Sequence, residues 1–168
     1  MRRLLGAIGV LVLALPAAAA GALGRGPGDG TLVVDNANGV VNLAIRGGVI
    51  GRFDQGTIVV VDPVEGDGPA PVLNGCEFKI RLTTKKTECD SSGSEVRFRL
   101  IGGLFRVHID AIGVDVSVVG RGSAELDGSG YTPQPGRYSL NGGPYRAVPK
   151  SPTQLTLGPF PAATLGAK

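Results

Sequence analysis

Apolar and polar residues alternate in short runs along most of this chain, and glycine or asparagine separates the runs. The pattern is clearest in residues 96–110, where apolar side chains fall at every second position on both sides of a Gly-Gly pair. A period of two residues is typical of β-strands that bury one face. No segment after residue 22 has a convincing helical period, so the sequence predicts an all-β fold with antiparallel strands.

Residues 96–110 are expected to form a hairpin, with the two glycines at 102–103 as its turn. In that register one side of the sheet receives all the apolar side chains: Val96, Phe98, Leu100, Phe105, Val107 and Ile109. The opposite side places Arg99 across from Arg106. On the same side, Arg97 lies across from the single histidine, His108.

The same pattern occurs 64 residues earlier around an Asn-Gly turn, because adding 64 to Leu32, Val34, Val41, Leu43 and Ile45 gives apolar positions of the later hairpin. Such self-similarity indicates an internal duplication. Two hairpin units, each with one apolar face, are most simply combined as an antiparallel β-sandwich or a flattened barrel. The alternative is a short β-solenoid, although solenoids usually contain more repeats.

The two ends differ from this central domain. The N-terminus has two arginines, an apolar run over residues 4–15 and then small residues, which is the pattern of a secretory signal peptide at 1–22. That run is too short to span a bilayer, so we expect no stable membrane insertion after cleavage and a secreted or cell-envelope location. A duplicated β domain at 25–130 follows, and residues 131–168 form a Pro/Gly-rich extension that we expect to be partly disordered.

Cys76 and Cys89 are the only cysteines. An exported protein meets an oxidising environment, so we predict a disulfide that closes an insert at 76–89. A metal or redox pair would favour CxxC spacing or nearby histidine ligands, which are absent here. The pair is therefore interpreted as a structural crosslink.

Overall charge does not point to a polyanionic partner. The chain has 17 basic and 14 acidic residues, and loss of Arg2 and Arg3 with the signal leaves 15 against 14, a net charge of +1. Only a local patch could then bind an anion. The candidate patch combines the cations of the second hairpin with those of the disulfide insert: Arg97, Arg99, Arg106, His108, Lys79 and Arg81.

Two interpretations of this patch remain open. It is either a solvated face, with repulsion relieved by nearby acids such as Glu77, Glu95 and Asp110, or a binding face. Guanidinium groups suit phosphate and carboxylate groups, so the expected partner is an anionic envelope polymer with phosphate or uronic acid groups. Nucleic acid is not expected, because the aromatic residues alternate onto the buried side, away from the cations.

Motifs for catalysis and cofactors are missing. His108 is the one candidate base, no serine lies near it in sequence, and its expected neighbours are cationic. The Asp-Gly turns lack the full alternation of oxygen ligands that a calcium loop needs. We therefore predict a protein that is not an enzyme and has no catalytic residues, no metal and no cofactor.

The signal and the segments GVIGRFDQGTI, FRLIGG, GRGSAELDG and YSLNGGPYR resemble small exported all-β proteins of high-GC bacteria. This resemblance covers most of the mature chain and has no diagnostic motif. It implies secretion and β structure, and it implies no functional site.

Three classes of function follow from these observations. The first is a non-catalytic extracellular or cell-envelope binding module that uses the basic face. The second is a structural or protein-interaction domain that meets another envelope protein through sheet edges or through the Pro-rich segment. The third is a hydrolase whose site is hidden by the linear order of the chain. The oligomeric state is left open.

Overall fold

The computed structural model describes residues 26–130 and 136–158, and this part of the chain contains strands and no helix. The predicted signal peptide lies outside the described residues. The strands are β1 (Gly30–Phe53), β2 (Gln55–Val61), β3 (Val72–Asn74), β4 (Phe78–Arg81), β5 (Lys86–Ser91), β6 (Val96–Leu100), β7 (Leu104–Asp127), β8 (Arg137–Leu140), β9 (Arg146–Ala147) and β10 (Thr153–Leu157). The predicted all-β class is confirmed.

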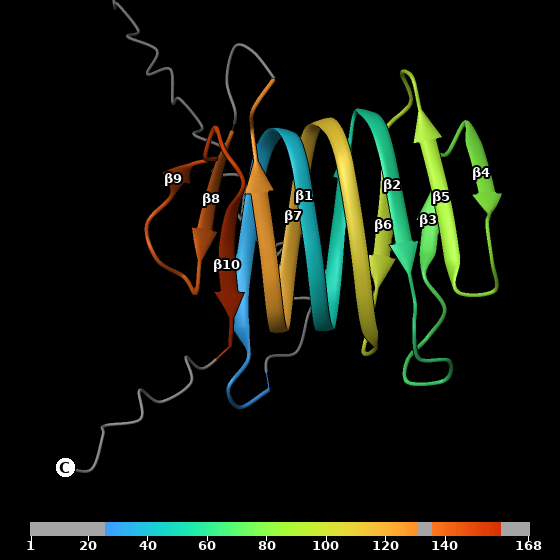
Figure 1. The fold of residues 1–168 in the computed structure, drawn as a ribbon, viewed down its shortest axis with the longest axis horizontal. Helices are drawn as coiled ribbons and strands as arrows, with labels where there is room; N and C mark the ends of the chain where they lie inside the picture. Colours follow the sequence, from blue (N-terminus) through green and yellow to red (C-terminus); the bar gives the residue numbers. More distant parts are fainter. Residues whose placement is uncertain (1–25, 131–135, 159–168) are drawn as a thin grey trace, which may run out of the picture.

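All ten strands belong to one antiparallel sheet, which is strongly curled into a half-barrel (Figure 1). The main path through it runs β3-β6-β1-β7-β2-β5-β4. β1 and β7 contain 24 residues each, and they bend repeatedly so that each passes from one side of the curl to the other. These two strands therefore wind around each other and form the centre of the domain.

The curl has two walls. The back wall consists of residues 30–36 and 47–53 of β1, residues 112–120 of β7, and strands β3, β6, β8 and β9. The front wall consists of residues 39–46 of β1, residues 104–111 and 121–127 of β7, and strands β2, β4, β5 and β10. Residues 136–158, which fall in the predicted extension, thus contribute strands to both walls.

Glycines at the bends allow β1 and β7 to cross closely. Gly47 and Gly120 are paired in the ladder, with φ values of +151° and +154°. A Cβ atom on Gly47 would lie 2.2 Å from the carbonyl oxygen of Val119, and one on Gly120 would lie 2.3 Å from that of Arg46. Only a residue without a side chain fits such an approach of backbone to backbone.

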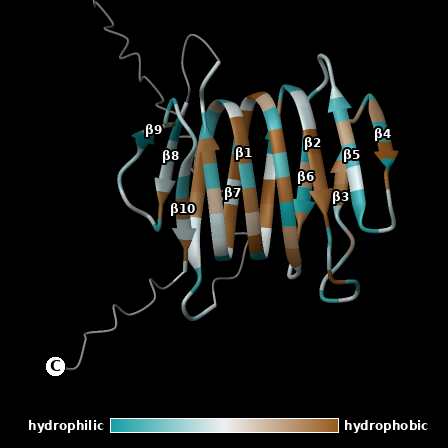
Figure 2. Ribbon diagram, in the orientation of Figure 1, coloured by the Kyte–Doolittle hydropathy of each residue, from teal (hydrophilic) through white to brown (hydrophobic). Residues whose placement is uncertain are grey.

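One hydrophobic core lies between the walls. Figure 2 shows hydrophobic and hydrophilic bands alternating along β1 and β7, as expected for strands with one buried face. The predicted inward positions of both units are buried and belong to this single cluster: Leu32, Val34, Val41, Leu43, Ile45, Val96, Phe98, Leu100, Phe105, Val107 and Ile109. For these positions, the prediction of burial is confirmed.

The two predicted hairpins, by contrast, are wrong. β6 pairs with β1 and β3 on the back wall, whereas residues 104–111 pair with β1 and β2 on the front wall. The glycines at 102–103 connect the walls, and their backbone groups bond to Gly47. Likewise, residues 30–36 and 39–46 of β1 do not pair with each other in the described ladders. Alternation identifies the buried face of a strand but not its neighbours, because both walls face the same core.

Every strand pair in the described ranges is antiparallel. The successive coils of a parallel β-solenoid would instead pair in parallel.

The disulfide prediction is confirmed, since the Sγ atoms of Cys76 and Cys89 are 2.05 Å apart. This crosslink ties the start of the β4–β5 segment to buried Cys89 at the end of the front wall, and closing such a loop stabilises a fold by about 3 kcal/mol.

Candidate functional site

The predicted cationic residues of the second unit lie on two opposite surfaces. Arg97 and Arg99 point outward from β6 on the back wall, while Arg106 and His108 point outward from β7 on the front wall. In the register, Arg99 neighbours Ile50 and not Arg106. The prediction that these side chains share one face is therefore wrong, because it depended on the hairpin.

Lys79 and Arg81 lie on a third strand. They lie on β4 at the end of the front wall, and the Lys79 Nζ atom donates a hydrogen bond to the carbonyl oxygen of Leu73 at a distance of 3.2 Å. The alternate side chains of β4, which the pattern predicts to be buried, include the exposed Phe78 and Ile80. All four residues of this strand are exposed, so its apolar side chains do not pack in the core.

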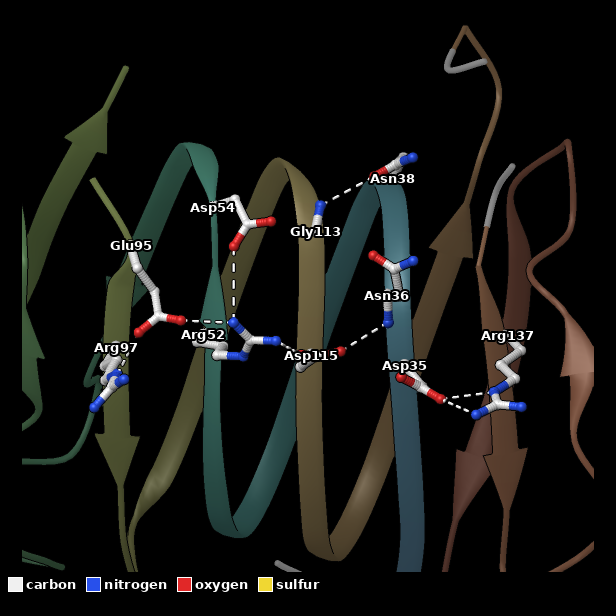
Figure 3. A network of polar contacts seen from close by, with 10 residues as sticks. All are labelled: Asp35, Asn36, Asn38, Arg52, Asp54, Glu95, Arg97, Gly113, Asp115 and Arg137. Carbon is white, nitrogen blue, oxygen red and sulfur yellow. Dashed lines mark hydrogen bonds and ion pairs between the residues drawn. The ribbon is translucent and has the colours of Figure 1, made fainter. Parts of the chain in front are cut away.

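Arg97 belongs to a network of ion pairs on the back wall (Figure 3). It lies directly opposite Arg52 of β1, and the Glu95 carboxylate contacts both guanidinium groups, at 2.5 Å from Arg97 Nε and 2.6 Å from Arg52 Nη1. Arg52 Nη2 also lies 2.6 Å from Asp115 Oδ2 on β7. We call Glu95, Arg97, Arg52 and Asp115 the charged row. Its opposite charges balance, which leaves no excess positive charge to attract an anion.

The charged row also fixes its own protonation states. Hydrogen bonds from Arg52, and then from Arg97, hold the pKa of Glu95 below its ordinary value. In return, hydrogen bonds to Glu95 and then Asp115 raise the pKa of Arg52. The Asp115 carboxylate additionally accepts a hydrogen bond from the backbone N–H of Asn36, at 2.7 Å. The row therefore links β6, β1 and β7 across the outside of the sheet.

We expect Glu95→Gln to reduce the dependence of stability on acid pH. Because the pKa of Glu95 is lowered by folding, its contribution is present above the ordinary value of 4.5 and is lost as the pH falls through the lower native value. Urea unfolding at a series of pH values from about 6 to about 3 measures this loss. Glu65→Gln, at an exposed loop position, is the control. An unchanged pH profile in Glu95→Gln would contradict the proposed role.

Beside the charged row lies an open depression of about 560 Å³, which we call the outer groove. Val33, Ser117 and Ile50 form its floor, and they are neighbours in register across three strand segments. The same register continues to Arg99 on β6. The outer groove is thus a mainly apolar strip across the back wall with an arginine in line at one end.

Arg99 is the cation of this strip with no internal partner. Its guanidinium makes no hydrogen bond and no ion pair with any residue in 26–130 or 136–158. It also borders a second depression, of about 260 Å³, which includes Pro69, Val72 and Ile101. An unpaired guanidinium between two apolar surfaces can bind a carboxylate or a phosphate with two parallel hydrogen bonds.

The other end of the outer groove is formed by Tyr145. The guanidinium of Arg137 lies over the Tyr145 ring, 4.7 Å from its centroid, and Arg137 also pairs with the Asp35 carboxylate. Figure 3 shows Asp35 and Arg137 beyond the charged row, on β1 and β8. Tyr145 is 52 % exposed, so it offers aromatic surface to a ligand in the outer groove.

His108 belongs to a different site, on the front wall. Gln154, Glu125, Asn42 and His108 occupy adjacent strands in register and form a hydrogen-bonded chain that we call the polar ladder. The Asn42 amide donates to Glu125 at 2.9 Å, so its oxygen is directed at His108 Nδ1, 2.7 Å away. Nδ1 is therefore the donor in this contact, because an amide oxygen only accepts.

The polar ladder lines a shallow depression of about 280 Å³ that also includes Arg106 and Ser123. Within the described residues, the hydrogen-bond partner of the His108 ring is Asn42, and no hydroxyl or thiol bonds to it. A nucleophile activated by histidine requires such a bond. In this part of the chain, the polar ladder orients the imidazole through Asn42.

In the described ranges, no group of three or more His, Cys, Asp or Glu side chains is placed to hold a metal ion. Residues 26–130 and 136–158 also contain no helix of the length and hydrophobicity that a membrane span requires.

Sequence reasoning identified Arg99 but missed Arg52, Asp115 and Tyr145. The first two occupy outward positions of alternating strands, which is a signal that the sequence does contain. Their partners, however, come from strands more than 40 residues away in the chain, since Arg52 contacts Glu95 and Asp115. Only the pairing of β1 with β6 and β7 brings them together.

Comparisons with protein-family models, with curated proteins and with solved structures give no match for this chain.

Proposed function

We propose that this protein is a non-catalytic binding module that acts outside the cytoplasm, and that its outer groove holds an anionic ligand with an apolar body. The observation that carries this proposal is the position of Arg99. Its guanidinium has no partner in the described residues, and it lies in register with the apolar floor of the outer groove. Such a site joins one charged anchor to apolar contact area, which is the usual composition of a ligand-binding cleft.

Charge balance limits the kind of ligand. Arg97 and Arg52 are already neutralised by Glu95 and Asp115, so a dense polyanion would gain one strong contact and meet carboxylates beside it. A ligand with a single carboxylate or phosphate near Arg99 avoids this repulsion. An anionic envelope polymer also avoids this repulsion if its acid groups are widely spaced. Its sugar rings can place an apolar face on Tyr145.

The proposed location rests on two observations. Residues 1–22 have the pattern of a secretory signal peptide, and Cys76 and Cys89 are joined by a disulfide. Disulfides persist mainly in oxidising compartments. We propose on this basis that the mature protein is secreted or associated with the cell envelope.

Arg99→Ser tests the proposed ligand site. We expect it to weaken binding of decyl phosphate at least about tenfold, since a hydrogen-bonded charged group contributes more than 1.4 kcal/mol. Calorimetric titration of the mature, oxidised protein measures the affinity. Polygalacturonate, titrated in parallel, distinguishes a polymer from a small amphiphile as the source of the acid group.

Arg106→Ser is the matched control, because this arginine is equally unpaired in the described structure but lies on the front wall. It should leave the affinity unchanged. An equal loss in both variants would indicate general electrostatic attraction. That result, or the absence of binding by the unaltered protein, would refute the outer groove as the ligand site.

We also propose that the curled sheet derives from a duplicated unit whose copies pack as a sandwich. The register supports this interpretation: Val41 pairs with Ile109, and Ile45 pairs with Phe105. Adding 64 to positions 41 and 45 gives 105 and 109, so exchange of the two copies reproduces the same pairs. The two segments also contribute to the walls in the same order. The segment before β3, which contains β1 and β2, and the segment after β5, which contains β6 and β7, each run through the back, front, back and front walls.

A further inference from the structure

The edge strand β4 (Phe78–Arg81) is the most unusual surface of the front wall, and it is separate from the outer groove. It terminates the sheet and pairs with β5 alone among the described strands (Figure 1). Phe78, Ile80 and Leu82 are 68 %, 51 % and 44 % exposed. Three large apolar side chains on alternate positions form a continuous exposed surface, which an edge strand normally avoids.

The backbone of β4 is also open to a further strand. Leu82 donates its N–H to the carbonyl oxygen of Lys86 in β5, and in an antiparallel ladder the residues that bond to one neighbour alternate with those that face away. The backbone N–H and C=O groups of Lys79 and Arg81 therefore point to the free edge. An added strand would satisfy them with main-chain hydrogen bonds.

The two faces of β4 have different chemistry. Phe78, Ile80 and Leu82 occupy one face, and the cations Lys79 and Arg81 occupy the other. A strand laid along this edge would place its own alternate side chains beside each set. Apolar side chains complement the first face, and acidic side chains complement the second.

We propose that β4 binds an extended segment of a partner protein as an added strand, and that this segment alternates apolar and acidic residues. A second copy of this chain is a poorer occupant. In the symmetric antiparallel registers centred on Lys79, Ile80 or Arg81, two cations lie directly opposite each other, which destabilises the pair. Charge complementarity therefore selects an acidic partner strand over self-association.

The test uses the mature protein and a blocked octapeptide that alternates valine and glutamate. Binding is followed by NMR, and we expect the largest shifts at the amides of Lys79 and Arg81. The double variant K79E/R81E should weaken binding of this peptide at least tenfold. The same variant should gain affinity for a peptide that alternates valine and lysine, a reversal that loss of structure would not produce.

Two controls complete the design. Methylation of alternate backbone nitrogens in the glutamate peptide should abolish binding, because it removes the main-chain donors. Arg99→Ser should bind the peptide normally, which separates this surface from the outer groove. Shifts remote from β4, charge variants without effect, dimerisation of the protein alone, or binding to anionic phosphatidylglycerol vesicles in place of the peptide would each overturn the proposal.

Discussion

Replacement of Gly120 by alanine is expected to lower the free energy of unfolding by about 4 kcal/mol, from a strained backbone angle and from steric overlap together. The φ angle of Gly120 is +154°, and its added Cβ atom would lie 2.3 Å from the carbonyl oxygen of Arg46. That oxygen belongs to the backbone of the neighbouring strand, so no side-chain rotation relieves the overlap. β1 and β7 would have to separate at this pair of residues.

Equilibrium urea unfolding measures this effect, and two further variants separate its causes. Gly130→Ala has a positive φ of +78° but an open position, and Gly93→Ala has neither a positive φ nor a neighbour within 4 Å. We expect a loss of about 1 kcal/mol in the first variant and less than about 0.5 kcal/mol in the second. A Gly120→Ala protein as stable as Gly130→Ala would show that the crossing tolerates a side chain.

Phe105→Ala is expected to destabilise the fold by about 3 to 5 kcal/mol. Phe105 lies in the front-wall segment of β7 and is fully buried in the single core between the walls. The apolar surface of its ring is lost from the core, and neighbours held on both walls by backbone ladders cannot close the cavity. The expected change is thus that of truncating a fully buried aromatic side chain.

Phe78→Ala provides the matched control, because it makes the same chemical change at a side chain that is 68 % exposed. Its unfolding free energy should stay within about 0.5 kcal/mol of the unaltered protein. Thermal and urea unfolding of both variants measure the difference. Equal losses at the two positions would contradict the placement of the core between the walls.

The burial pattern was predictable from the sequence, whereas the strand neighbours were not. Alternation at Phe105, Val107 and Ile109 is a local property of the chain, and it correctly identified their buried side. The partners of these residues are Ile45, Leu43 and Val41, and nothing in a local period distinguishes them from the nearer β6. A Gly-Gly pair is compatible both with a tight hairpin turn and with a connection between walls.

The same distinction between burial and strand neighbours explains which features of the candidate site were predictable. Arg99 could be recognised as an outward cation because that depends only on alternation. Its lack of a partner depends on the neighbours of β6, which turned out to be β1 and β3. In β4, alternation does not mark a buried face. Both faces of this strand are exposed, because the hydrophobic core does not extend to this edge of the sheet.

The pairing of β1 also determines the order in which the domain can fold. All its ladder partners, in β6, β7 and β8, begin at Val96 or later. During synthesis from the N-terminus, both edges of β1 therefore stay unpaired until more than forty further residues have followed. Contacts of such long sequence separation slow folding. The first long strand therefore has no ladder partner until β6 has been made, and its longest ladder can form only after β7 follows.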